Sequence, residues 1–189
     1  MNSILRSGCI LAALIFPASA ANADVPEGVA VKGETWIGTI HAEGAQVYEC
    51  KSHEGGPLTW QFREPIATLI VDGETVGTHY AGPHWELNDG SKILGKVTGR
   101  APGDTDMDIP LLRLESSPQS PKGLLAGITT IQRLNTRGGV AKGPCEKAGE
   151  MLSVPYSADY VFHRKIRWSL IPETAAAEPA QAKPAQAKN

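Results

Sequence analysis

The sequence predicts an all-β protein: a single antiparallel β-barrel or sandwich with long loops and one disulfide. Many short apolar runs follow one another at close spacing, and no stretch sustains the apolar period of a helix. Glycine and proline number 20 and 14 in the 189 residues, and they are scattered too densely for long helices. Between residues 160 and 170, large side chains take the even positions, and the odd positions include His163, Lys165, Arg167 and Ser169, which indicates a strand with one buried face.

The strands can be placed in order from their β-branched and aromatic residues and from the turns between them. Ala42-Glu43-Gly44 is a short glycine-containing turn between the first two strands, so these two are expected to form a hairpin. Asp72-Gly73 marks another turn, because Asp-Gly sequences readily adopt positive φ, and Asn88-Asp89-Gly90 marks a third. The expected strands are residues 34–41, 45–51, 58–62, 67–71, 75–81, 85–87, 92–98, 111–114, 125–134 and 160–170, with exposed loops at 101–108 and 116–123.

The first 23 residues have the composition of an export signal. Arg6 supplies a positive start, residues 9–16 (CILAALIF) are apolar, and small residues follow Pro17. The apolar run is far shorter than the roughly 20 residues that span a bilayer, which favours a cleaved signal peptide over an anchor. We expect cleavage after Ala23 and a secreted or periplasmic mature protein without a membrane span.

The rest of the chain is expected to form one domain and a tail. Residues 24–172 are numerous enough for an all-β domain with a hydrophobic core. Residues 173–189 (ETAAAEPAQAKPAQAKN) repeat Pro-Ala-Gln-Ala-Lys and lack core-forming side chains, which predicts a disordered tail. The formal net charge is -2 and no basic stripe occurs, so nucleic acid is not expected as a partner.

Removal of the signal peptide leaves two cysteines, Cys50 and Cys145. In an exported domain, two cysteines most often form one disulfide. The alternative is a pair of reduced, metal-bound thiols, but the chain has no CxxC spacing to support it.

Residues 78–91 (THYAGPHWELNDGS) form the most informative segment, because they combine histidines, aromatic residues and acids with two turn signals. Such a segment is typical of a binding loop on a rigid scaffold, and equally of a tightly packed hairpin. We expect the loop from His79 to Asp89 to bind a ligand, with contacts from Tyr80, His84 and Trp85.

The same segment could instead carry metal or acid–base chemistry. His79, His84 and Glu86 bear groups that bind divalent ions, and a fourth ligand could come from Asp89, His41 or His53. Glu86 with His79 could serve as acid and base in a hydrolase or lyase, and Glu86 could also form a carboxylate pair with Asp89 or Asp159. The alternative is that the histidines bond to the backbone and Asp89 simply starts a turn.

Two further groups are candidates. Arg137, followed by Gly138-Gly139, could bind an anion through its guanidinium and the backbone N–H groups, or could lie in an ordinary turn. Tyr156, Asp159 and Tyr160 could line the lip of a pocket or form a buried hydrogen-bonded corner. The first interpretation is therefore a binding or envelope-associated module for a small molecule, a glycan or an envelope protein; a hydrolase or lyase and a divalent-metal module are the alternatives.

Several segments resemble the exported domain-of-unknown-function family numbered 3455. They are residues 44–50 (GAQVYEC), 79–83 (HYAGP), 85–86 (WE), 89–91 (DGS), 131–136 (IQRLNT) and 154–162 (VPYSADYVF), in preserved order. The chain departs from the pattern after Pro110, where a tryptophan is expected, and at His84, where a small polar residue is usual. The resemblance implies a secreted or periplasmic, largely β protein, and it brings no established activity or cofactor. Some members carry a malate-dehydrogenase-like label, but the absence of a G-x-G-x-x-G motif excludes a nicotinamide enzyme.

Overall fold

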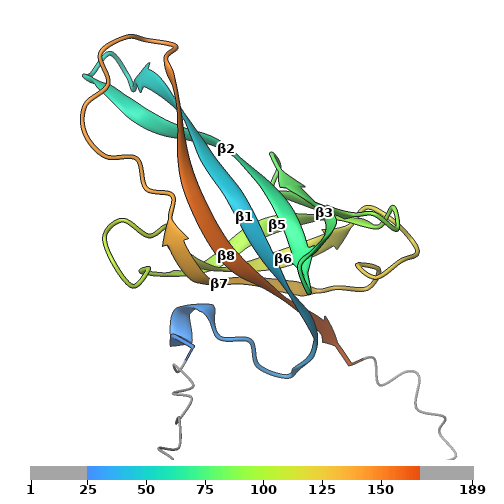
Figure 1. The fold of residues 1–189 in the computed structure, drawn as a ribbon. Coiled ribbons are helices and arrows are strands. Elements are labelled where there is room, and N and C mark those ends of the chain that lie inside the picture. The colour runs from blue at the N-terminus through green and yellow to red at the C-terminus, as the bar shows by residue number, and fades with distance from the viewer. Residues whose placement is uncertain (1–24, 167–189) are drawn as a thin grey trace, which may run out of the picture.

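The computed structural model describes residues 25–166, which form eight antiparallel strands and one short 3-10 helix. Each strand pairs with the next one in the chain, and β8 pairs back with β1, so the strands close into a barrel (Figure 1). The all-β expectation is confirmed. The elements are η1 (Glu27–Val29), β1 (Glu34–Ser52), β2 (Leu58–Val71), β3 (Glu74–Tyr80), β4 (His84–Leu87), β5 (Lys92–Ala101), β6 (Leu111–Pro118), β7 (Thr130–Gly138) and β8 (Met151–Lys165).

The expected signal peptide (1–23) and the expected tail (173–189) lie outside the described residues. Within residues 25–166, no helix is long and apolar enough to cross a membrane.

The hairpin expected around Ala42-Glu43-Gly44 is not formed, and this prediction was wrong. β1 is one strand of 19 residues, and Ala42 and Gly44 pair with β2 on one side and β8 on the other. Partners on both edges keep this segment extended, so the small size of Gly44 serves close packing instead of turning. In the same way, residues 58–62 and 67–71 join into the single strand β2. Figure 1 shows β1, β2 and β8 running together as a long ribbon beyond the shorter strands.

Other boundaries also differ from the expectation. The strand expected at 125–134 begins only at Thr130, and the last strand begins at Met151 instead of Tyr160. The Asp72-Gly73 and Asn88-Asp89-Gly90 turns are confirmed: Asp72 and Gly73 have φ of 50° and 82°, and Gly90 has φ of 78°. Two successive residues of positive φ are what a two-residue hairpin turn between twisted strands requires.

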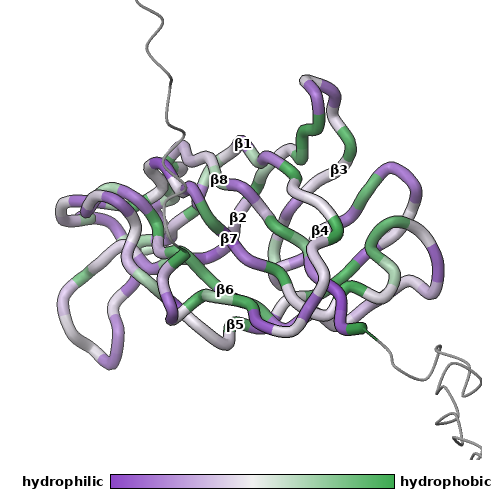
Figure 2. Tube along the Cα trace, turned by 90° about the horizontal axis from the view of Figure 1, so that it is seen from below, coloured by the Kyte–Doolittle hydropathy of each residue, from purple (hydrophilic) through white to green (hydrophobic). Residues whose placement is uncertain are grey.

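Alternation along each strand creates the core. The even residues of β8 from Tyr156 to Phe162 are all buried. Of the even positions that were expected to face the core, Tyr160 and Phe162 are buried, whereas Arg164 and Ile166 are exposed. Residues 167–170 of the expected strand lie outside the described range. In Figure 2 the tube changes repeatedly between hydrophilic and hydrophobic colours along the strands. The buried cluster includes Leu69, Trp85, Ile93, Leu114, Ile131, Tyr160 and Phe162.

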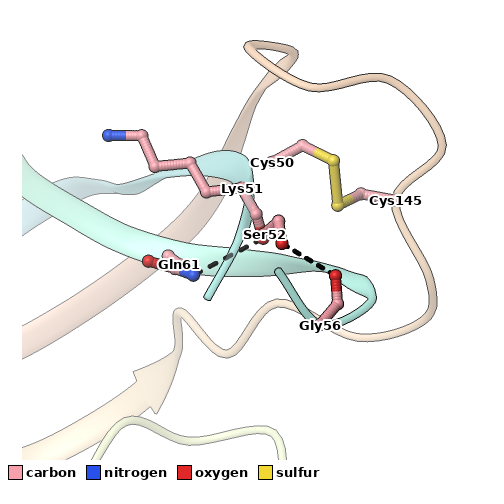
Figure 3. The surroundings of a disulfide bond; sticks show 6 residues. All are labelled: Cys50, Lys51, Ser52, Gly56, Gln61 and Cys145. Atoms are coloured by element: carbon pink, nitrogen blue, oxygen red, sulfur yellow. Dashed lines mark hydrogen bonds between the residues drawn. A yellow bond between two sulfur atoms is a disulfide. The ribbon is translucent and has the colours of Figure 1, made fainter. Parts of the chain in front are cut away.

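The predicted disulfide is confirmed. Cys50, near the end of β1, is bonded to Cys145 in the β7–β8 connection, 95 residues further along the chain (Figure 3). The bond fastens this connection to the extended end of β1. Beside it, the Ser52 hydroxyl donates a hydrogen bond to Gly56 O and closes the β1–β2 turn (Figure 3).

Glycine at position 44 allows β1 and β2 to approach closely. A Cβ atom at Gly44 would lie 2.0 Å from Ile66 O and 2.5 Å from Ala67 Cα, so Gly44→Ala requires a shift of the backbone. Overpacking of this kind costs about 1–3 kcal/mol or more, and we expect the free energy of unfolding in urea to fall by at least that amount. The matched control is Gly38→Ala on the same strand, where a Cβ meets nothing within 4 Å. Equal effects of the two substitutions would contradict this account.

Loss of the disulfide should destabilise the protein. For the double variant Cys50→Ser/Cys145→Ser we expect the free energy of unfolding to fall by about 2–5 kcal/mol, because the unfolded chain loses the constraint of a long closed loop. Urea unfolding with and without reductant measures the change. Reductant should lower the midpoint of the native protein and leave that of the double variant where it is; a native midpoint that does not respond to reductant argues against the bond.

Candidate ligand-binding site

A cavity of about 540 Å³ lies inside the barrel. It is lined from all eight strands, and it faces the end of the barrel at which the β3–β4 turn, the β5–β6 loop and the β7–β8 connection meet. The walls are mostly apolar, with a small number of polar side chains among them. Its lining includes Gln46, Tyr48, Phe62, Arg63, Pro65, His79, Trp85, Val97, Arg100, Leu112, Leu114, Arg133 and Tyr160.

Strand register explains why these side chains meet. Directly paired residues on antiparallel strands face the same side of the sheet. Arg100 pairs with Leu112, Leu112 with Arg133, and Arg133 with Tyr160, which forms one inward-facing row across four strands. His79 pairs with Trp85 in the same way on β3 and β4.

His79 is buried in the cavity wall and is held on three sides. Its ring stacks on Trp85, with centroids 4.4 Å apart, and contacts Tyr160 at 4.9 Å. Its Nδ1 lies 2.7 Å from His84 O. Because a carbonyl oxygen only accepts, Nδ1 carries the proton and donates this hydrogen bond.

The protonation state of His79 follows from its burial. Burial lowers the pKa of His79 to about 3, and the positive charge of Arg133 adds to this lowering, while the hydrogen bond to His84 opposes it. The imidazole is therefore neutral near pH 7, with Nε2 unprotonated. Nε2 makes no hydrogen bond to any residue between 25 and 166, so it can accept one from a molecule in the cavity.

Two further polar groups of the lining also lack protein partners. Gln46 Nε2 and Trp85 Nε1 are buried, and neither makes a hydrogen bond within the described part of the chain. Unpaired buried N–H groups are costly, and a ligand with acceptor oxygens would satisfy them.

The other polar residues of the 79–89 segment face away from the cavity. Tyr80 donates a hydrogen bond from its hydroxyl to Glu86 Oε2 at 2.6 Å, and Lys92 Nζ lies 3.7 Å from the same oxygen. His84 stacks on Tyr80 and donates from Nδ1 to Ala81 O. The hydrogen bond to Tyr80, followed by the charge of Lys92, holds the pKa of Glu86 below its usual value. These residues form a surface cluster on the outer side of the β3–β4 hairpin.

The proposed metal triad of His79, His84 and Glu86 is therefore not assembled. His79 pairs with Trp85, and both side chains face the interior. His84 and Glu86 are the neighbours of Trp85 on β4. Because successive residues of a strand face opposite sides of the sheet, His84 and Glu86 face outward. No group of three or more metal-binding side chains occurs among residues 25–166. Glu86 and His79 face opposite sides of the sheet, so they do not form the expected acid–base pair either.

Asp89 stabilises a turn. Its carboxylate accepts hydrogen bonds from the Ser91 N–H, the Ser91 hydroxyl and the Leu124 N–H. These bonds, led by that of the Ser91 hydroxyl, lower the pKa of Asp89. The residue thus fixes the loop before β7 against the β4–β5 turn, as the turn alternative predicted.

The last residues of β7 do bind an anion through a glycine N–H, but the anion is a carboxylate of the same chain. Gly138 N donates to Asp108 Oδ1 at 2.6 Å, and Arg137 forms an ion pair with Asp104 at 2.5 Å. Both contacts join the β5–β6 loop to the end of β7.

The Tyr156, Asp159 and Tyr160 group is divided between the two faces of β8. The Tyr156 and Tyr160 hydroxyls lie 3.4 Å apart in the interior, and burial raises the pKa of both. Asp159 faces outward, where it bonds to His41 Nδ1 at 2.8 Å and to Asn135 Nδ2 at 2.7 Å. Only Tyr160 of the three lines the cavity.

Sequence reasoning missed several residues of the cavity. Gln46, Arg100 and Arg133 stand on different strands. Gln46 and Arg133 lie in segments that carry the family resemblance, but no local pattern marks any of the three as a cavity residue. The available signal was a charged or polar residue at an inward position of an alternating strand, which becomes visible only once the register is known.

The low pKa of His79 generates a pH dependence. The folded state releases its proton at about pH 3 and the unfolded state near 6.5, so the unfolded state binds the proton first as pH falls. The free energy of unfolding should therefore decrease from about pH 6.5 down to about pH 3. His79→Phe, which keeps an aromatic ring against Trp85, should make this decrease shallower in urea unfolding over that range. His53→Gln, at an exposed histidine, should leave the slope as it is; an equal slope in His79→Phe and the native protein would contradict the assignment.

The comparisons with known proteins identify a family and no activity. No curated protein matches the chain, and no solved structure matches it. The family model described as "Protein of unknown function (DUF3455)" matches residues 70–164, which run from the end of β2 to the end of β8. This match covers half of the chain, and its position includes His79, Trp85, Arg100, Arg133 and Tyr160 of the cavity lining. The chain therefore belongs to this uncharacterised family, as the resemblance of its segments indicated.

Proposed function

We propose that the protein binds a small, largely apolar molecule inside the barrel. The observation that carries this proposal is the cavity of about 540 Å³ with walls from all eight strands. Cavities of about 300–1,000 Å³ with apolar walls and a few polar groups are typical small-molecule sites. Eight-stranded barrels are also just wide enough to hold one small ligand.

The arrangement of the lining supports binding at this place. Leu112 and Leu114 supply a buried apolar wall, and Phe62 lies at the opening with more than half of its surface exposed. The Phe62 ring packs edge-on against Tyr48, with centroids 5.8 Å apart. An exposed aromatic ring at the mouth of an apolar cavity offers additional surface to a ligand that enters.

Within the expected binding loop from His79 to Asp89, the proposed contacts come from the residues that line the cavity. His79 and Trp85 contribute to the cavity wall, whereas Tyr80, His84 and Glu86 contact one another outside it. The separation of Glu86 from His79 favours binding over the hydrolase or lyase alternative, because an acid and a base must reach the same substrate.

We also propose that the protein acts outside the cytoplasm, secreted or periplasmic after cleavage behind Ala23. The signal-like composition of the first 23 residues supports export. The bond between Cys50 and Cys145 agrees with it, because disulfides persist mainly in oxidising compartments.

A neutral apolar dye tests the cavity. N-phenyl-1-naphthylamine should gain fluorescence on addition of the native protein. Val97→Phe, which places a larger side chain in the lining, should weaken binding of the dye by about tenfold or more. Ile66→Phe makes a similar change on the exposed outer face of β2 and should bind the dye as the native protein does.

Thermal unfolding of both variants establishes that each is folded. If folded Val97→Phe binds the dye as tightly as the native protein does, the dye site lies outside the barrel. If the native protein does not bind the dye, the proposed binding cavity is contradicted.

A further inference from the structure

The charged side chains that line the cavity are all arginines. Arg63, Arg100 and Arg133 line it, and no aspartate or glutamate does. Arg63 forms an ion pair with Glu64 at 3.1 Å, which offsets its charge. Arg100 and Arg133 have no ion-pair partner among residues 25–166. The cavity therefore carries uncompensated positive charge.

Register brings these two arginines to the same level of the barrel. Both pair with Leu112, Arg100 from β5 and Arg133 from β7. Their Cα atoms are thus two strand spacings apart, about 10 Å. Both side chains line the cavity, Arg100 at an exposed position and Arg133 half-buried. Two guanidinium groups on long side chains at this separation can reach one small anionic group between them.

Arg133 is held in place without being neutralised. Its Nε and Nη2 donate to Pro110 O at 3.1 Å and 2.8 Å, and this carbonyl oxygen carries no full negative charge that would neutralise it. Burial raises the pKa of Tyr160, and the positive charge of Arg133 opposes this rise. The charge of Arg133 also opposes the rise in the pKa of Tyr48 that burial causes. The positive charge of Arg133 therefore lowers the pKa of two tyrosines that line the cavity.

The cavity lining also holds buried hydrogen-bond donors without protein partners. Gln46 and Trp85 present N–H groups that lack protein acceptors, and both residues are almost completely buried. Donors without acceptors, together with cations without anions, complement a ligand rich in oxygen and negative charge.

We propose that the ligand is a single-chain amphiphile with an anionic head group, a carboxylate being the simplest. Arg100 and Arg133 hold the head group, and the apolar chain lies against the walls that Leu112 and Leu114 form. This inference rests on the proposed function and adds the chemical class of the molecule that is bound.

Matched amphiphiles test the head group. Decanoate, decan-1-ol and decylammonium share one apolar chain and differ in charge, and displacement of N-phenyl-1-naphthylamine, below their aggregation concentrations, gives a dissociation constant for each. The native protein should bind decanoate at least about tenfold more tightly than decan-1-ol, and decylammonium least tightly. Added salt should weaken decanoate binding and leave decan-1-ol unaffected.

Arginine variants locate the interaction. Arg100→Gln, Arg133→Gln and the double variant should weaken decanoate binding, the double variant by about tenfold or more, and should weaken decan-1-ol binding by a much smaller factor. Arg133→Lys retains the charge and should retain most of the decanoate affinity. Lys96→Gln removes a positive charge from an exposed position on β5 outside the cavity lining, and it should bind decanoate as the native protein does.

The outcomes separate the inference from the proposed function. Equal affinity for decanoate and decan-1-ol, a preference for decylammonium, or an equal loss in Lys96→Gln and Arg133→Gln would overturn the anionic head group and leave an apolar binding cavity. Failure of the dye and of all three amphiphiles to bind the native protein would overturn the proposed function itself.

Discussion

Pairing between β1 and β8 is the interaction on which the rest of the structure depends. It joins the first strand of the barrel to the last, and β1 is therefore hydrogen-bonded along both edges. Closure leaves no free edge in the barrel, and it directs the inward residues of all eight strands toward one interior. The core, the cavity and the separation of polar side chains into two faces all follow from that closure.

The interior is not uniform along its length. Leu69, Ile93, Ile131 and Phe162 fill one end with apolar side chains. Toward the other end the inward positions are taken by His79, Arg100, Arg133 and other groups with polar atoms, and there the packing leaves a cavity. Large polar side chains do not pack as tightly as branched aliphatic ones and need partners for their polar atoms. A closed, stable end and an open, binding end can thus coexist in one small barrel.

Loops at the open end are fastened by contacts that the chain makes with itself. Asp108 bonds to Gly138 N, Arg137 pairs with Asp104, and the disulfide joins Cys145 to Cys50. These contacts link the β5–β6 loop, the β7–β8 connection and the end of β1 around the mouth of the cavity. A site whose rim is held in this way loses little conformational entropy when a ligand binds.

The sequence by itself determined the fold class, the pairing of Cys50 with Cys145, the Asp72-Gly73 turn and the family, because each depends on local pattern, on composition or on a simple count. It also located the β3–β4 segment as important.

Only the tertiary structure decided which residues share a face. A shift of one position moves a side chain from the interior to the surface, and this separated His79 from Glu86 and brought Arg100 and Arg133 to the two sides of Leu112. Neighbours across a barrel are distant in sequence, so no local pattern reveals them.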